Sequence, residues 1–339
     1  MAPAPTAAPD LLVRLKDLSV TYNTRLGEVS AVDAVSLGIY RGEILGLVGE
    51  SGCGKSTLGR ALLRMIPPPG YITHGEILFD GDDVMAYDQA ALRDYRGRRV
   101  GMIFQDPMTS LNPVQRVDQH VVEAIHVHEP RTLPRAALER TRALAERLGI
   151  RADRLASYPH QLSGGMRQRV MISLGLVLNA ELVVADEATT SLDVIVEANL
   201  LDQLRELRDD YGMSILLITH NIALVAEVAD RIAVMYAGRM AEVGSVYDVF
   251  DGPLHPYTRG LLRSVPNIRL DDTEELYKMP GEPPNLTDPP AGCRFHPRCP
   301  QSMAICAAQQ PPMATAAEGH LVQCWLYADG NDAAGEVRP

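Results

Sequence analysis

The sequence predicts an α/β protein built on a largely parallel sheet, and two observations support this fold class. Short apolar strand patterns alternate with longer helical patterns through most of the 339 residues, which is the order typical of a parallel sheet. One strand and one helix, at residues 44–48 and 58–65, enclose a segment with the pattern G-x-x-x-x-G-K-S. That pattern between a strand and a helix is typical of a loop that binds the phosphates of a nucleotide.

The other elements are predicted in chain order from their apolar periodicity. Strands are expected at residues 11–22, 29–39, 75–79, 99–104, 182–185, 215–219, 232–236 and 239–243. Helices are expected at residues 134–149, at residues 197–210 and 257–264, and in a segment that ends at residue 178. The first of these helices has the clearest limits, because Pro134 suits a first helical turn and Gly149 suits a helix end.

The composition of the chain narrows the class of protein. With 46% hydrophobic and 22% charged residues it is ordinary for a globular protein, and it contains no apolar run of about eighteen residues that would span a bilayer. Residues 1–9 lack the basic and apolar regions of a signal peptide, so we expect a cytoplasmic protein. The net charge of −11 and the aromatic content of 5% both argue against a surface that binds nucleic acid.

Shifts in composition divide the chain into seven predicted segments. Helical patterns replace strands after the strand at 99–104, and towards the C-terminus prolines become frequent while periodicity fades. The segments are a disordered lead-in (1–10), the first part of a nucleotide-binding core (11–105), a helical subdomain (106–162), the second part of the core (163–250), a Pro-rich linker (251–291), a cysteine module (292–327) and a disordered tail (328–339).

The phosphate-binding segment supplies most of the predicted ligands of a nucleoside triphosphate. Glycines allow successive backbone N–H groups to turn towards phosphate oxygens, and the following helix adds the positive end of its dipole. Lys55 is expected to reach the β- and γ-phosphates, and the Ser56 hydroxyl to ligate Mg²⁺. The alternative is a glycine-rich turn with a surface lysine. The predicted binding residues are Gly49, Glu50, Ser51, Gly52, Cys53, Gly54, Lys55, Ser56 and Thr57.

Polar residues follow three other predicted strands at their C-terminal ends, where open α/β sheets bind ligands. Asp186 is expected to hold Mg²⁺, and Glu187 to act as the general base on an attacking water. Gln105 is expected to contact the metal or that water, and His220 to hydrogen-bond the γ-phosphate. If the strands are neighbours, all these groups converge on one γ-phosphate. Each of these groups also has a plainer alternative. The acidic pair could serve solubility, Gln105 could be an ordinary loop glutamine, and His220 could be a structural histidine.

Two further features are predicted to contact the nucleotide. Ser163 is a suitable helix N-cap, and Gly164 and Gly165 permit close approach of backbone to phosphate. One nucleotide needs only one phosphate loop in its own chain, so this second site suggests ATP sandwiched between two subunits. Tyr22 lies 27 residues before Gly49 and is placed either to stack on adenine or to pack on a sheet face.

Four of the five cysteines crowd into the last fifty residues with the spacing C-x5-C-x6-C-x17-C. In a reducing compartment such a group more often binds metal than forms disulfides. The spacing is not the tight C-x2-C pairing of common zinc sites or of bacterial ferredoxins, so iron–sulfur, zinc and free or disulfide-bonded thiols stay open. The candidate ligands are Cys293, Cys299, Cys306 and Cys324.

Taken together, the motifs resemble those of ABC-transporter ATPase subunits in order and spacing. The matching segments are 49–57 (Walker A), Gln105 (Q-loop), 162–168 (signature), 182–187 (Walker B), 191–193 (D-loop) and His220 (switch histidine), with Tyr22 similar to the A-loop aromatic. A narrower resemblance extends over almost the whole chain. Residues 105–113, 158–171, 255–258 and 292–300 resemble the D-type ATPase of oligopeptide/dipeptide importers.

The resemblance implies a P-loop (RecA-like) ABC ATPase core with an antiparallel β subdomain, a helical insert and a small C-terminal cysteine module. It also implies ATP and Mg²⁺ as cofactors, and a [4Fe–4S] cluster on the four cysteines, with Zn²⁺ as the alternative. The ATPase would form a dimer with a related F-type subunit or a second copy. It would dock at the cytoplasmic face of the membrane on two permeases fed by an extracytoplasmic binding protein.

The function that the resemblance implies is ATP hydrolysis coupled to uptake of di- or oligopeptides. Relatives of this family also carry nickel or oligosaccharides, so the cargo stays open. A soluble ABC-type ATPase acting on nucleic acid is disfavoured by the acidic charge, and a P-loop kinase by the signature motif. Three positions depart from the family pattern without removing a catalytic group: Ala188, Glu197 and Asn221.

Overall fold

The structure is a computed structural model that describes residues 10–25, 27–105, 110–187, 194–264 and 277–328. Its residues form two compact units. Unit 1 comprises Met1–Val13, Ile39–Ile44 and Phe79–Ile218, and unit 2 comprises Arg14–Gly38, Leu45–Leu78 and Thr219–Pro339. The segments predicted to be disordered, 1–10 and 328–339, fall outside the described residues except for Asp10 and Ala328.

Unit 1 contains a parallel sheet in the order β8-β7-β6. Its strands are β6 (Val100–Ile103), β7 (Leu182–Asp186) and β8 (Ser214–Thr219), and every residue in them is buried. Parallel strands covered on both faces have continuous apolar runs, which is why these strands could be found in the sequence. The register pairs Ile103 with Ala185 and Asp186 with Ile218, so the C-terminal ends of these strands are level.

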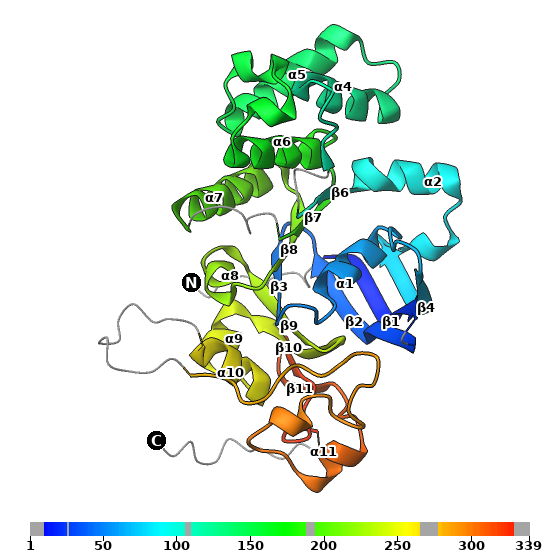
Figure 1. Cartoon of the computed structure of the whole chain (residues 1–339), viewed down its shortest axis with the longest axis vertical. Helices are drawn as coiled ribbons and strands as arrows, with labels where there is room; N and C mark the ends of the chain where they lie inside the picture. The colour runs from blue at the N-terminus through cyan, green and yellow to red at the C-terminus, as the bar shows by residue number, and fades with distance from the viewer. Residues whose placement is uncertain (1–9, 26, 106–109, 188–193, 265–276, 329–339) are drawn as a thin grey trace, which may run out of the picture. The chain divides into compact units, whose positions relative to one another are not determined.

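Helices make up most of the rest of unit 1. Its helical elements are η1 (Val84–Ala86), α2 (Gln89–Asp94), η2 (Tyr95–Arg99), α4 (Val117–His128), α5 (Pro134–Arg147), η3 (Ala152–Ala156), η4 (Pro159–Gln161), α6 (Gly164–Leu176) and α7 (Val194–Tyr211). Figure 1 shows α4, α5 and α6 as one green group. The start predicted for α5 at Pro134 is confirmed, but the helix ends at Arg147, two residues before the predicted end, because Gly149 at φ +69° lies just beyond the Leu148 cap.

Unit 2 contains a mixed run of strands in the order β11-β12-β10-β9-β3. Only β3 and β9 in this run are parallel, and the other pairs are antiparallel. The strands are β3 (Ile44–Val48), β9 (Arg231–Tyr236), β10 (Arg239–Ser245), β11 (Ala314–Ala317) and β12 (His320–Val322). A second sheet has the order β2-β1-β4, with β1 (Leu11–Thr24), β2 (Gly27–Tyr40) and β4 (Gly70–Phe79), followed along the chain by the short β5 (Asp82–Asp83).

The helices of unit 2 are shorter. They are α1 (Lys55–Leu62), α8 (Ile222–Val228), α9 (Val246–Asp251), α10 (Pro256–Arg263), η5 (His296–Arg298) and α11 (Ala304–Ala308). The predicted helix at 58–65 is wrong at both ends. Helix α1 begins at Lys55 because Gly54, at φ +104°, caps it directly after the loop.

The sequence did not reveal how the cysteine segment is attached. Strand β12 pairs antiparallel with β10, with Glu242 opposite Val322, so this segment extends the sheet of unit 2. An independently folded module at residues 292–327 is therefore not confirmed. In the described ranges, no helix is both long and apolar enough to cross a bilayer.

Candidate nucleotide site

The phosphate-binding loop lies between β3 and α1, as predicted. Two of its glycines admit no side chain, because a Cβ at Gly49 would lie 2.1 Å from the Met235 carbonyl oxygen and one at Gly54 would lie 2.1 Å from that of Ala31. Their φ angles of +155° and +104° also belong to the region that favours glycine. Neighbouring backbone therefore fixes the path of the loop.

Lys55 is the first residue of α1 and is 4% exposed. Its Nζ donates hydrogen bonds to the carbonyl oxygens of Gly49 (2.8 Å) and Glu50 (3.1 Å). The ammonium group is thus held beneath the start of the loop rather than projecting into solvent, and the alternative of a surface lysine is wrong.

Cys53 is a buried residue of the loop. It is 5% exposed, its carbonyl oxygen accepts a hydrogen bond of 2.8 Å from the Gly238 N–H, and burial raises the pKa of its thiol. Cys53 therefore packs as a neutral side chain.

Tyr22, in β1, is half-buried. A Cβ at Gly70 would lie 2.5 Å from Cε1 of Tyr22, so the tyrosine ring packs directly over this glycine. One part of the Tyr22 ring is thus fixed by packing and another part stays accessible. Its contact with adenine stays a prediction.

Unit 1 brings three of the predicted site residues together at the C-terminal ends of β6 and β7. Asp186 ends β7 and is fully buried, while Gln105 is exposed just beyond β6. The Gln105 Nε2 donates a hydrogen bond of 2.5 Å to the Glu187 Oε2. These side chains meet because adjacent parallel strands end level with each other.

The backbone of Glu187 has an unusual conformation. Its φ is +46°, in the left-handed region that non-glycine residues seldom occupy. The Glu187 N–H donates a hydrogen bond of 2.9 Å to the Ile218 carbonyl oxygen, which holds this conformation in place. Strained backbone of this kind is concentrated at functional sites. Ala188, which follows, and the D-loop residues 191–193 lie outside the described residues.

His220 follows β8 directly and is exposed. The next residue explains one departure from the family pattern: the Asn221 side chain caps α8 by accepting a hydrogen bond of 3.4 Å from the Leu224 N–H. Asparagine and aspartate are equally good N-caps, so this substitution preserves the start of α8.

The signature segment forms the start of α6. Ser163 is its N-cap and accepts a hydrogen bond of 3.4 Å from the Met166 N–H, which confirms the predicted cap. Ser163 and Gly164 are exposed, and α6 is 13 residues long. The positive end of its dipole is therefore open to an anion from outside the chain.

The four C-terminal cysteines line one pocket in unit 2 and are not disulfide-bonded. Burial raises the pKa of Cys293, of Cys299 and, to about 12, of Cys324. Mutual repulsion of neighbouring thiolates adds to each of these shifts. Within the part of the chain that the structure describes, no group of three or more His, Cys, Asp or Glu side chains is arranged to hold a metal ion.

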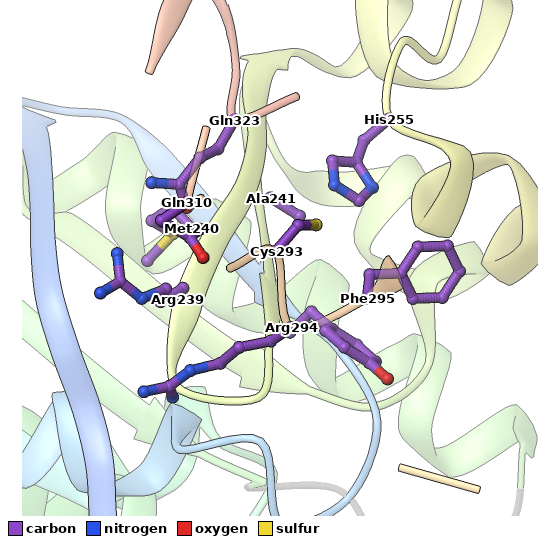
Figure 2. Close-up of a pocket in the computed structure, with 10 residues that line it drawn as sticks. Arg239, Met240, Ala241, His255, Cys293, Arg294, Phe295, Gln310 and Gln323 are labelled. Atoms are coloured by element: carbon purple, nitrogen blue, oxygen red, sulfur yellow. The ribbon is translucent and has the colours of Figure 1, made fainter. Parts of the chain in front are cut away.

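A second pocket adjoins this one, and Figure 2 shows Cys293 and Arg294 turned to opposite sides of their segment. Arg294 donates hydrogen bonds to the Ala237 carbonyl oxygen and to Asp33, which also pairs with Arg239. The Cys293 thiol is turned towards the side of His255. Arg294 thus fastens the cysteine segment to β2 and to the β9–β10 turn.

Comparison with known proteins identifies the family. Residues 32–190 match the family model described as ABC transporter, and residues 241–306 match the one described as Oligopeptide/dipeptide transporter, C-terminal region. The oligopeptide transport ATP-binding protein OppD of Bacillus subtilis is 45% identical over 318 residues, covering 93% of this chain and 88% of its own length. The chain belongs to the ATP-binding proteins of oligopeptide/dipeptide ABC transporters. OppD of Escherichia coli is 43% identical, with 93% of each chain covered.

Solved structures of ABC cassettes agree with this membership. The dimeric post-hydrolysis structure of the ATP-binding cassette MJ0796 with ADP and Pi has a TM-score of 0.63 and 25% identity, covering 69% of this chain and 99% of the cassette. The structure of cbiO1 from Clostridium perfringens has a TM-score of 0.62 and 28% identity, covering 72% of this chain and 92% of cbiO1. The predicted family and cassette fold are confirmed, and the chain is an ABC ATPase.

Sequence reasoning missed two residues of this ABC ATPase that touch the phosphate loop. Tyr257 accepts a hydrogen bond from the backbone of Glu50, and Arg298 forms an ion pair with its carboxylate. Both lie in segments that carry the resemblance to D-type subunits, 255–258 and 292–300. The resemblance of those segments to D-type subunits marked both residues, but it did not indicate that they contact the phosphate loop. A cavity of about 240 Å³ adjoins the same stretch of loop and is also lined by residues 283–286.

Proposed function

We propose that this ATPase binds Mg²⁺–ATP at the interface of two ATPase subunits and uses its hydrolysis to drive uptake of di- or oligopeptides. The observation that carries the proposal is the Gln105–Glu187 hydrogen bond beside the buried Asp186. It places an oriented carboxylate next to a candidate metal ligand, which is what activation of a water for attack on the γ-phosphate requires.

Each group in the proposed site has a separate task. Lys55 and the loop N–H groups bind the β- and γ-phosphates, with Tyr22 against adenine. Mg²⁺, when bound, neutralises charge on the phosphates, with Ser56, Asp186 and Gln105 as its candidate ligands. Glu187 accepts the proton of the attacking water. His220 contacts the γ-phosphate and thereby distinguishes ATP from ADP.

The proposed partners follow from the exposed start of α6. Ser163 and Gly164 would bind the γ-phosphate of an ATP held by a second subunit, either an F-type relative or another copy of this chain. Closure and reopening of the dimer would gate two permeases at the cytoplasmic face of the membrane, supplied by an extracytoplasmic binding protein. Peptide cargo is supported by relatives that are named as oligopeptide and dipeptide transport proteins.

An uptake experiment tests the cargo and the role together. Cells that lack this gene are expected to regain uptake of a radiolabelled tripeptide when supplied with the wild-type chain, but not with Lys55→Ala. Nickel and oligosaccharide uptake is measured in the same cells. Restored nickel or oligosaccharide uptake without peptide uptake would overturn the peptide assignment and leave the ATPase assignment standing.

We also propose that Cys293, Cys299, Cys306 and Cys324 hold a [4Fe–4S] cluster. The support is that all four thiols line one pocket. In such a cluster each thiolate binds a different iron, so the ligands need not surround a single point, as the ligands of one zinc ion must. Among the described residues no group of three or more His, Cys, Asp or Glu side chains is arranged around one ion, and a cluster does not require such a group. The proposed task of the cluster is to hold the surrounding segment together.

Metal analysis of anaerobically purified protein tests this assignment. We expect broad visible absorption and about four iron per chain, lost in Cys324→Ser and kept in the control Cys53→Ser. About one zinc per chain without colour would favour the zinc alternative. Protein with neither metal would mean that the four cysteines bind no metal.

A further inference from the structure

Glu50 of the phosphate loop is held by residues from the C-terminal part of unit 2. The Arg298 guanidinium donates two hydrogen bonds to the Glu50 carboxylate, from Nη1 at 2.7 Å and from Nη2 at 3.0 Å. The Glu50 N–H donates a third, of 2.9 Å, to the Tyr257 hydroxyl. Bidentate pairing of arginine with a carboxylate fixes direction as well as distance.

Arg298 is itself fixed in place. Its side chain is 5% exposed, its Nε donates to the Pro280 carbonyl oxygen at 2.9 Å, and its Nη1 also donates to the Tyr236 hydroxyl at 3.2 Å. Tyr257 is fully buried, and its ring lies 4.6 Å from that of Tyr236. The two side chains that hold Glu50 are therefore packed in the interior and are not mobile side chains on the surface.

Every polar group of Glu50 forms a hydrogen bond. Its N–H binds Tyr257 and its carboxylate binds Arg298, while its carbonyl oxygen accepts a hydrogen bond of 3.1 Å from Lys55 Nζ. A displacement of Glu50 would therefore shift the lysine and the adjacent loop N–H groups at the same time. A phosphate cradle binds tightly only if its donors are already in position, because ordering them on binding costs free energy.

We propose that Arg298 and Tyr257 are positioning residues for ATP, which hold the phosphate loop in its binding conformation through Glu50. Arg298 ends η5 and directly precedes Cys299, so this arginine joins the cysteine segment directly to the nucleotide loop. Loss or rearrangement of the cysteine segment then lowers the affinity for ATP. The inference rests on the proposed role of residues 49–57 in binding ATP.

Equilibrium titration of the full chain with a fluorescent, slowly hydrolysed ATP analogue tests the proposal. Arg298→Gln and Glu50→Gln are each expected to weaken binding about tenfold, and the double variant is expected to bind no more weakly than either single variant, as for directly coupled residues. In ATPase assays the change should appear in KM more than in kcat. Arg298→Lys, which keeps the charge but loses the paired geometry, is expected to give a smaller loss.

Arg259→Gln is the matched control, since Arg259 is a half-buried arginine of the same unit whose guanidinium donates hydrogen bonds to the Pro253 carbonyl oxygen and the Tyr327 hydroxyl instead of the loop. Its affinity for the analogue is expected to stay within about twofold of wild type, which is the size of effect expected when a residue has no energetic link to the site. Equal losses in Arg259→Gln and Arg298→Gln, or additive losses in the double variant, would overturn the proposal. If wild type fails to bind, or Lys55→Ala binds as tightly, the phosphate-loop assignment itself fails. If wild type binds the analogue and Lys55→Ala does not, but Arg298→Gln binds it as tightly as wild type, only the positioning role is overturned.

Discussion

Glu187→Gln is expected to stop ATP turnover while leaving ATP binding intact. The amide has nearly the same size as the carboxylate, and its oxygen can still accept the hydrogen bond from Gln105. It cannot, however, take a proton from the attacking water. General-base catalysis contributes about 10²–10⁴-fold to rate, so kcat should fall by at least about a hundredfold. Phosphate release and nucleotide affinity measured on the same preparation check both parts.

Glu181→Gln is a fair control for this experiment. Glu181 immediately precedes β7, at the opposite end of the strand from Glu187, and pairs with Arg41 and Arg99. Its replacement changes the net charge by the same amount but removes only exposed or partly exposed ion pairs, so ATP turnover should stay near wild type. Undiminished hydrolysis in Glu187→Gln would show that another group activates the water.

Glu242→Ala is expected to lower the free energy of unfolding of unit 2 by about 3–5 kcal/mol, the range for removing one member of a buried, charged, hydrogen-bonded group. The Glu242 side chain is fully buried on β10. Its carboxylate accepts hydrogen bonds from the backbone N–H groups of Leu254 (2.8 Å) and His255 (2.9 Å), and Nε2 of His320 lies 2.8 Å from Oε1. Alanine would leave these groups buried without an acceptor.

Denaturant titration followed by tryptophan fluorescence measures this loss. Trp325 is the single tryptophan of the chain and lies three residues beyond β12, so its signal reports on the affected region. Glu242→Gln keeps one carbonyl oxygen and should give an intermediate loss. Glu227→Ala removes an exposed glutamate of α8 and should change stability by less than about 0.5 kcal/mol. A wild-type unfolding curve for Glu242→Ala would mean that water replaces the carboxylate.

Local patterns in the sequence predicted most of the elements that form the site. Strand β3 was predicted at its observed limits, because a strand buried on both faces is a continuous apolar run between turn residues. The N-cap at Ser163 followed from the preference of serine for that position. Element limits were less certain where a glycine with positive φ sets them, as Gly54 does for α1.

The sequence by itself determined the family, the α/β class and the positions of the motif residues, because these depend on neighbours close along the chain. Only the tertiary structure decided what surrounds them. Glu50 is separated from Tyr257 by 207 residues and from Arg298 by 248 residues, yet all its hydrogen-bonding groups but one are bound by these two side chains. Periodicity and spacing predict contacts within one helix or strand. They contain no information on which distant side chain a folded chain brings to a given carboxylate.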